Sequence, residues 1–193
     1  MIKRLGLCWD GTEQKFEDLL LGTAGKFDDF SYLEIGICYC QTLQSAYLSL
    51  RENRSRFRIT GVDPVPIPQQ DFKDDLSSDS RIRIFTNTAQ VFFNQNKEVF
   101  HFVIIDGCHS EACTMSDFIS VEKFSVPGTV VLFHDFQIGC QGQDMQPHCN
   151  QPIGVRRAVE NLGLFSGSRN GWKQLDTIVG TNGSEVAVFE RVL

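Results

Sequence analysis

Residues 99–109, with the sequence VFHFVIIDGCH, combine an apolar run with an acid, a glycine and a histidine at its end. The run of β-branched and aromatic residues over 99–105 predicts a strand that is buried on both faces of a sheet. Polar residues that directly follow such a strand lie at its carboxyl end, where open α/β sheets bind their ligands. The segment therefore predicts an α/β fold with a functional site around Asp106 and His109.

Strands and helices are predicted to alternate on both sides of this segment. Further strands are expected at residues 31–37, 58–63, 81–86 and 128–133, and helices at 41–51, 89–94, 110–124 and 155–162. Residues 174–181 and 185–190 flank Asn182-Gly183, a strong hairpin signal. We therefore predict a Rossmann-like, doubly wound, mostly parallel sheet with a C-terminal antiparallel hairpin. One domain over residues 1–193 is expected, with an N-terminal segment at 1–29 and a core at 30–193.

Composition and charge narrow the classes of partner. The chain has 193 residues, of which 41% are hydrophobic and 22% charged, and its net charge is −6. A negative chain is a poor match for nucleic acid or an anionic membrane surface, because both attract clustered Lys and Arg. No apolar run reaches the length of a membrane span, and seven cysteines in a chain of this size indicate reduced thiols. We therefore expect a cytoplasmic protein with a small-molecule substrate, and homo-oligomerisation stays open.

Two early strand ends carry residues suited to a nucleotide-like ligand. Glu34-Ile35-Gly36 ends the strand at 31–37, and Gly61-Val62-Asp63 ends the next. A glycine in the first turn lets the backbone approach the ligand, and a carboxylate after the second strand can bind ribose hydroxyls. The alternative is that Gly36 only forms a turn and Asp63 only precedes a proline-rich loop.

Two later strand ends carry acids and imidazoles. Asp106 and His109 follow the strand at 99–105, and His134 and Asp135 follow the strand at 128–133. Carboxylates in this position can hold a divalent metal, and a histidine can act as a general base. The alternative is that the two acids cap the loops that follow and that His134 is a structural histidine.

The order of these segments resembles the class I S-adenosylmethionine (SAM)-dependent methyltransferases, in particular a family related to small-molecule O-methyltransferases. Residues 103–111, VIIDGCHSE, are similar to its IDG-x-H-x-Y-E segment, and Pro127-Gly128 with Phe133-His134-Asp135 is similar to its PGG…HD stretch. Residues 154–159 resemble the helix that follows. The likeness spans about residues 30–190 and implies a seven-stranded sheet with an antiparallel final strand.

The resemblance also implies roles for individual residues. His109 and Asp106 would be catalytic, with His109 as the base that removes a hydroxyl proton. The residues implied to bind SAM are Glu34, Gly36, Asp63, Asn87 and Asp106. Asp106 and Asp135 would be the ligands of a Mg²⁺ ion, if one is used. Residues 141–151 and the N-terminal segment would select the methyl acceptor.

This chain departs from the family at the loop after the first strand. Cys38 and Cys40 stand where family members carry glycine, and a Cβ there could crowd the methionine part of SAM. Two alternatives to O-methylation therefore remain. One is a non-catalytic protein that keeps the fold as a binding or assembly module. The other is a nicotinamide-dependent oxidoreductase, although the chain has no G-x-G-x-x-G motif.

Overall fold

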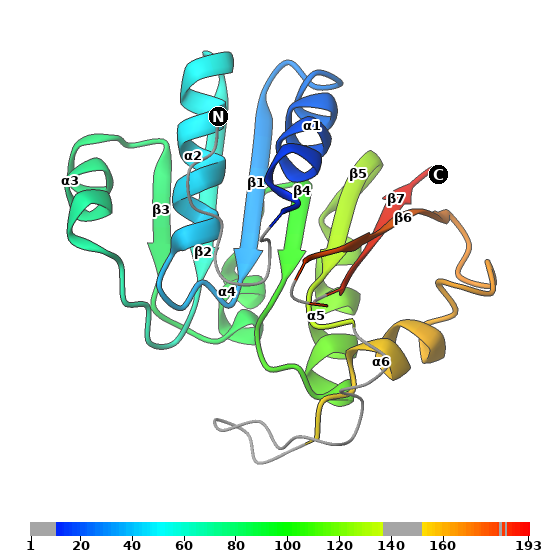
Figure 1. The fold of residues 1–193 in the computed structure, drawn as a ribbon. Coiled ribbons are helices and arrows are strands. Elements are labelled where there is room, and N and C mark those ends of the chain that lie inside the picture. Colours follow the sequence, from blue (N-terminus) through cyan, green and yellow to red (C-terminus); the bar gives the residue numbers. More distant parts are fainter. Residues whose placement is uncertain (1–10, 137–151, 182, 184) are drawn as a thin grey trace.

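The computed structural model describes residues 11–136, 152–181, 183 and 185–193. These residues form a seven-stranded sheet whose strands lie in the order β3-β2-β1-β4-β5-β7-β6 (Figure 1). The strands are β1 (Phe30–Ile35), β2 (Phe57–Val62), β3 (Ile82–Phe85), β4 (Phe100–Ile105), β5 (Ser125–Phe133), β6 (Trp172–Val179) and β7 (Glu185–Arg191).

The first five strands are parallel to one another, and β7 runs antiparallel to both β5 and β6. The carboxyl ends of β1 to β5 consequently meet at one edge of the sheet, the lower edge in Figure 1. The predicted doubly wound sheet with a C-terminal antiparallel hairpin is therefore confirmed. Gly183 lies in the hairpin turn with a φ of 81°, while Asn182 is outside the described residues.

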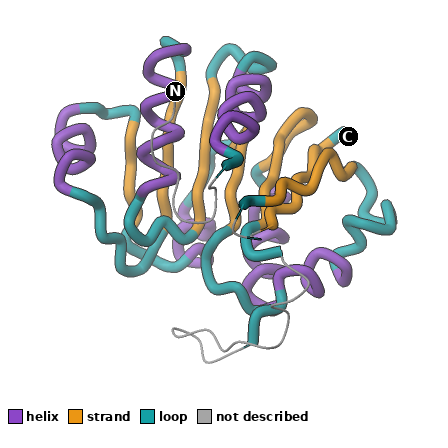
Figure 2. The backbone as a smooth tube through the Cα atoms, viewed as in Figure 1, coloured by secondary structure: helices purple, strands orange, loops and turns teal. Residues whose placement is uncertain are grey.

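Helices cover both faces of the sheet (Figure 2). One face packs against α1 (Glu13–Ala24), α2 (Gln41–Asn53) and α3 (Gln70–Ser78), and the other against α4 (Ala89–Gln95), α5 (Glu111–Lys123) and α6 (Val155–Asn161). Strand β4 supplies side chains to both layers: Phe102 and Ile104 join the first cluster, whereas Val103 and Ile105 join the second. This confirms that β4 is buried on both faces, as its apolar sequence predicts.

Two helices were not predicted from the sequence. In α1, Phe16, Leu20 and Ala24 recur every fourth residue and are fully buried in the same cluster as β1. Helix α3 begins two residues after Pro68 and anchors itself through one buried side chain, Phe72. Its remaining residues are too polar for a clear apolar stripe, which explains why the periodicity gave no signal there.

Among the residues that the structure describes, no helix combines the length and the apolar character that crossing a membrane requires. The loop at residues 141–151, which the sequence implied as a selector of the methyl acceptor, lies outside the described residues.

Candidate active site

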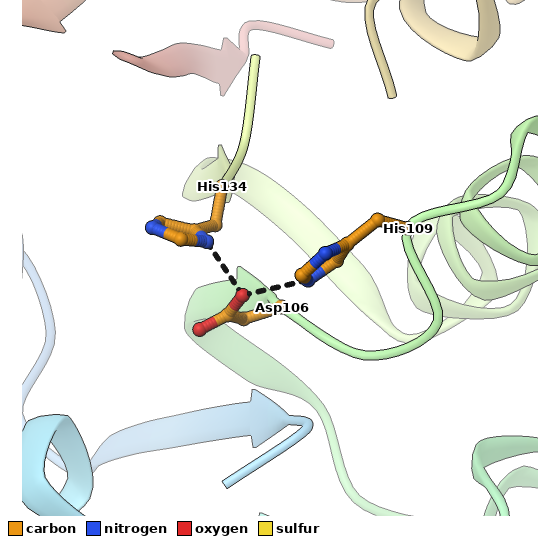
Figure 3. Close-up of side chains that lie close together, drawn as sticks. All are labelled: Asp106, His109 and His134. Carbon is orange, nitrogen blue, oxygen red and sulfur yellow. Dashed lines mark hydrogen bonds and ion pairs between the residues drawn. The ribbon is translucent and has the colours of Figure 1, made fainter. Parts of the chain in front are cut away.

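The ends of β4 and β5 bring two acids and two imidazoles together. Figure 3 shows three of them, Asp106, His109 and His134. The two strands are parallel neighbours with Ile105 opposite Phe133, and the His134 N–H donates to the Ile105 carbonyl at 3.1 Å. The first residues beyond the strands therefore lie side by side. His109 reaches the same place from the turn before α5, which begins after the capping residue Ser110.

The contacts within this group, called here the His–Asp cluster (Asp106, His109, His134 and Asp135), are short. His109 Nε2 lies 3.0 Å from Asp106 Oδ1, and His109 Nδ1 lies 2.8 Å from Asp135 Oδ2. His134 Nδ1 lies 2.6 Å from the same Asp106 oxygen. The His134 side chain is only 3% exposed, whereas that of His109 is 18% exposed. His109 is thus the more accessible imidazole, and it bridges the two carboxylates.

These contacts set the charges of the cluster. Burial disfavours the charged form of His109, but hydrogen bonds to Asp106 and Asp135 outweigh it and raise the His109 pKa to about 10. Burial likewise opposes charge on Asp106, but the two imidazoles lower its pKa to about 2. The pKa of Asp135 is also lowered, because its hydrogen bond to His109 and the imidazole charges outweigh burial. At neutral pH His109 is therefore an imidazolium held between two carboxylates.

The cluster fits a magnesium ion poorly. Asp106, His109 and His134 each offer one ligand atom, and these atoms lie within 4.8 Å of one another. Mg²⁺ prefers oxygen ligands, whereas a set with two imidazole nitrogens suits transition metals. The Mg²⁺ site at Asp106 and Asp135 stays a prediction, and no step below depends on it.

Gly36 follows β1, at a position where the backbone conformation and the neighbouring atoms leave no room for a side chain. Its φ is 84°, and a Cβ at this position would lie 2.1 Å from the Asp106 carbonyl oxygen. The Asp106 N–H donates to the Ile35 carbonyl at 2.8 Å. The turn after β1 is therefore pressed against the strand end that carries Asp106, and any side chain at position 36 would push the two apart.

The two cysteines in the next turn adopt the backbone conformation of glycine. Cys38 has a φ of 38° and Cys40 a φ of 59°, both in the left-handed region. The Cys40 side chain is fully buried in the core, and its Sγ lies 3.8 Å from the Cys38 carbonyl oxygen. The sulfur of Cys40 thus occupies core space beneath the turn.

Asp63, after β2, binds the same turn. Its Oδ2 accepts from the Cys38 N–H at 3.0 Å and its Oδ1 from the Val65 N–H at 2.7 Å. The Asp63 N–H in turn donates to the Phe85 carbonyl at 3.1 Å, so the ends of β2 and β3 adjoin. Asn87 is exposed two residues beyond Phe85, at the same edge of the sheet. The cofactor-type residues predicted from the sequence therefore lie along one edge.

Glu34 lies near the end of β1 and is 2% exposed. Its Oε2 accepts a hydrogen bond of 2.6 Å from the hydroxyl of Tyr32, which is also fully buried. Sequence reasoning missed Tyr32, although alternation along the strand predicted at 31–37 places residues 32 and 34 on the same face. It also left His134 out of the site, although His134 adjoins Asp135 at a strand end.

Comparison with known proteins identifies the family and supports the fold. Residues 33–136 match the family model described as a methyltransferase domain. No curated protein sequence matches the chain. Similar solved structures include a Klebsiella pneumoniae protein assigned as an O-methyltransferase, at 16% identity and a TM-score of 0.70, covering 95% of this chain and 82% of that one.

Two further similar structures are O-methyltransferases with a bound cofactor or product. The Bacillus cereus enzyme in complex with SAH (S-adenosylhomocysteine) is 20% identical, with a TM-score of 0.62, and the match covers 97% of this chain and 84% of that one. TomG from Streptomyces achromogenes, in complex with SAM, is 19% identical, with a TM-score of 0.61, and the match covers 93% and 80%. The chain therefore belongs to the methyltransferase-domain family, and the resemblance to class I SAM-dependent methyltransferases is confirmed.

Proposed function

We propose that this protein is a SAM-dependent methyltransferase that methylates a hydroxyl group of a small molecule. The observation that carries the proposal is the convergence on one sheet edge of Glu34, Gly36 and Asp63 with the His–Asp cluster one strand further along. The family match and the structural neighbours that were crystallised with SAM or SAH support it.

The residues at the ends of β1 and β2 fit a cationic nucleoside. Asp63 offers a carboxylate for the ribose hydroxyls and Glu34 a buried carboxyl group, while Asp106 after β4 adds negative charge and Asn87 after β3 is available for the base. The Cys40 side chain is buried in the core, which supports a cofactor loop that can still accept SAM. SAM, when bound, would supply an electrophilic methyl group. The task of the chain is then to orient the acceptor hydroxyl and to remove its proton.

We assign the proton transfer to His109, under one condition that the structure imposes. Because both ring nitrogens face carboxylates, His109 can accept a proton only after one carboxylate gives way. His134 Nδ1 lies 2.6 Å from Asp106 Oδ1 and 3.3 Å from Asp135 Oδ1, so Asp135 is the less tightly held carboxylate and the one that we assign to be displaced by the acceptor hydroxyl. Losing that hydrogen bond lowers the His109 pKa, so the ring releases its Nδ1 proton to solvent and becomes the neutral imidazole that can accept the hydroxyl proton. Asp106 keeps the ring oriented.

Calorimetry with SAM followed by a methyl-transfer assay on a panel of small hydroxylated compounds tests the proposal. Submillimolar binding of SAM together with transfer to any panel member supports it. Transfer to amines or thiols but not to hydroxyls would support the methyltransferase activity and refute the proposal that the acceptor is a hydroxyl group.

A non-catalytic role is the second candidate, and two observations favour it. Cys38 and Cys40 hold left-handed backbone positions, and the two carboxylates beside His109 raise its pKa to about 10, which disfavours the neutral form that a base requires. A binding module of this fold would not need a free base. Absence of SAM binding at millimolar concentration would favour this second candidate.

A further inference from the structure

Tyr32 and Glu34 form a buried pair at the end of β1. The two residues alternate along the strand and so project from the same face of the sheet. Their side chains are joined by the hydrogen bond of 2.6 Å, and Tyr32 stacks on Phe102 of β4 with ring centroids 5.8 Å apart. The stacking and the full burial of Tyr32 hold its hydroxyl in place beneath the Glu34 carboxyl group.

The surroundings of Glu34 supply little positive charge. The groups that act on it are Tyr32 on β1, Asp63 after β2, Asp106 after β4, His134 after β5 and Cys40 before α2. Among the described residues, no Lys or Arg forms an ion pair with Glu34. Burial raises the Glu34 pKa to about 8, the Tyr32 hydrogen bond and His134 oppose the rise, and Asp106 and Asp63 add to it. Before a ligand arrives, Glu34 is thus mostly a neutral acid at pH 7.

We propose that the Tyr32–Glu34 pair holds a proton that leaves when SAM binds, so that the end of β1 gains a negative charge as the cationic ligand binds. The inference rests on the proposed function. The O–H bond of the Glu34 carboxyl group breaks, its proton passes to the solvent, and no bond of SAM changes. Tyr32 remains the donor to the carboxylate that is formed, and is therefore a positioning residue for it.

The proposal fixes the sign of a pH effect. A positive ligand favours the carboxylate form of Glu34, and by linkage the carboxylate form favours the ligand. The affinity for SAM should therefore rise as the pH rises through about 8 and level off above it. Below that range each binding event must expel a proton, which weakens binding about tenfold for each pH unit.

Calorimetric titration of the full chain with SAM, in phosphate and in Tris, counts the proton. The two buffers differ in ionisation enthalpy, so the difference in binding heat gives the number of protons released. A pKa of about 8 predicts release of roughly 0.9 proton per SAM at pH 7 and close to none at pH 9.5. Binding without proton release at pH 7 would overturn the inference and leave the proposed function standing. Absence of SAM binding would refute both the inference and the proposed function.

Three variants identify the source of the proton. Glu34→Gln should bind SAM with no proton release and with little dependence on pH. Tyr32→Phe removes the donor, so the midpoint of the affinity profile should move to higher pH and the affinity at pH 7 should fall several-fold. Tyr47→Phe is the matched control, because the buried Tyr47 likewise donates to a carboxylate, Asp79, at 2.8 Å but lies on α2. It should leave both quantities unchanged.

The His–Asp cluster is the competing source, because His109 is also protonated at neutral pH. Release that persists in Glu34→Gln and disappears in His109→Asn would assign the proton to the cluster and refute the role of Glu34. Release that disappears in Glu34→Gln and persists in His109→Asn supports it.

Discussion

Glu34 and Asp106 are carboxyl groups at the ends of neighbouring parallel strands, yet they differ in charge. The pKa of Glu34 is raised to about 8, and that of Asp106 is lowered to about 2. Burial acts in the same direction on both, so it does not account for the difference. Asp106 has two imidazole nitrogens within 3.0 Å of its Oδ1, whereas the nearest partner of Glu34 is the neutral hydroxyl of Tyr32.

This comparison shows how one sheet edge can hold two chemically different regions. The end of β1 keeps a neutral, proton-holding group, while the ends of β4 and β5 keep a set of paired charges. A cationic ligand at the first region changes its protonation, whereas the second is already ionised. The partners, more than the depth of burial, determine the charge state in each region.

Removing the imidazole that bridges the two carboxylates should have the largest effect. His109→Ala removes the assigned base, and turnover should fall by about 10²–10⁴-fold, equivalent to about 3–5 kcal/mol. SAM affinity should not weaken, since loss of an imidazolium leaves the edge more negative. A methyl-transfer assay and calorimetry measure the two quantities. Turnover that survives the substitution would show that another group removes the proton.

Asp117 extends the comparison to a third carboxyl group. It lies on α5, is 9% exposed, and burial alone raises its pKa to about 7. The folded protein therefore binds the Asp117 proton more tightly than the unfolded chain, and this contribution to stability is lost as the pH rises from about 4 to 7. Asp117→Asn removes this loss. Between pH 4 and pH 8, the free energy of unfolding should shift in favour of the variant by about 4 kcal/mol.

Urea unfolding of both proteins across that pH range measures the shift. Asp28→Asn, at an exposed site before β1, is the matched control and should change the free energy of unfolding by no more than a few tenths of a kcal/mol. If the difference in free energy of unfolding between Asp117→Asn and the parent chain did not change with pH, Asp117 would have a partner in solution. Its burial would then not be comparable with that of Glu34.

Much of the fold follows from the sequence, because its strands are short apolar runs punctuated by turn residues. The apolar segment at 99–105 and the Asn182-Gly183 turn predicted β4 and the β6–β7 hairpin within two residues. Helix α3 escaped prediction because tertiary packing, through the buried Phe72, holds a polar sequence in place. Its helical state depends on a sheet surface that local sequence does not encode. In α1, the apolar spacing of Phe16, Leu20 and Ala24 is a helical signal that sequence reasoning overlooked.

The sequence predicts where the candidate site residues lie, but not their protonation states. The rule that ligands bind at the carboxyl ends of parallel strands located Glu34, Asp63, Asp106 and His109 correctly at one edge. It could not reveal that His109 bridges two carboxylates, because that depends on the direction of side chains from two strands. For the same reason the pairing of Tyr32 with Glu34 became evident only in three dimensions.

Asp63 is intermediate between Glu34 and Asp106 in its partners, since its carboxylate is held by backbone N–H groups and not by a hydroxyl or by imidazoles. Asp63→Ala should weaken SAM binding by about 10–30-fold, or about 1.4–2 kcal/mol, because the ribose ligand and the acceptor for the Cys38 and Val65 N–H groups are lost together. Asp63→Asn keeps one carbonyl acceptor, so its affinity for SAM should lie between that of the parent chain and that of Asp63→Ala. Calorimetry ranks the three proteins, and equal affinities would remove Asp63 from the cofactor site.

The smallest effect is expected from His134→Gln, which tests the pairing of His134 with Asp106 through acid unfolding. His134→Gln removes one of the imidazoles that lower the Asp106 pKa, so this pKa should rise toward its ordinary value. A depressed carboxyl pKa contributes stability above about pH 4 that is lost as the pH falls toward 2. The variant should therefore begin to unfold at a higher pH than the parent chain, with a loss of about 1 kcal/mol attributable to Asp106.

His101→Gln is the control of opposite sign. His101 is a half-buried histidine on β4 at the far end of the sheet, and burial lowers its pKa. A histidine that is kept neutral in the folded state destabilises the protein once acid charges the unfolded chain, so replacing it should move acid unfolding to lower pH. Circular dichroism between pH 7 and pH 2 follows both variants. Shifts in the same direction would mean that general packing, and not the pairing of His134 with Asp106, governs the acid response.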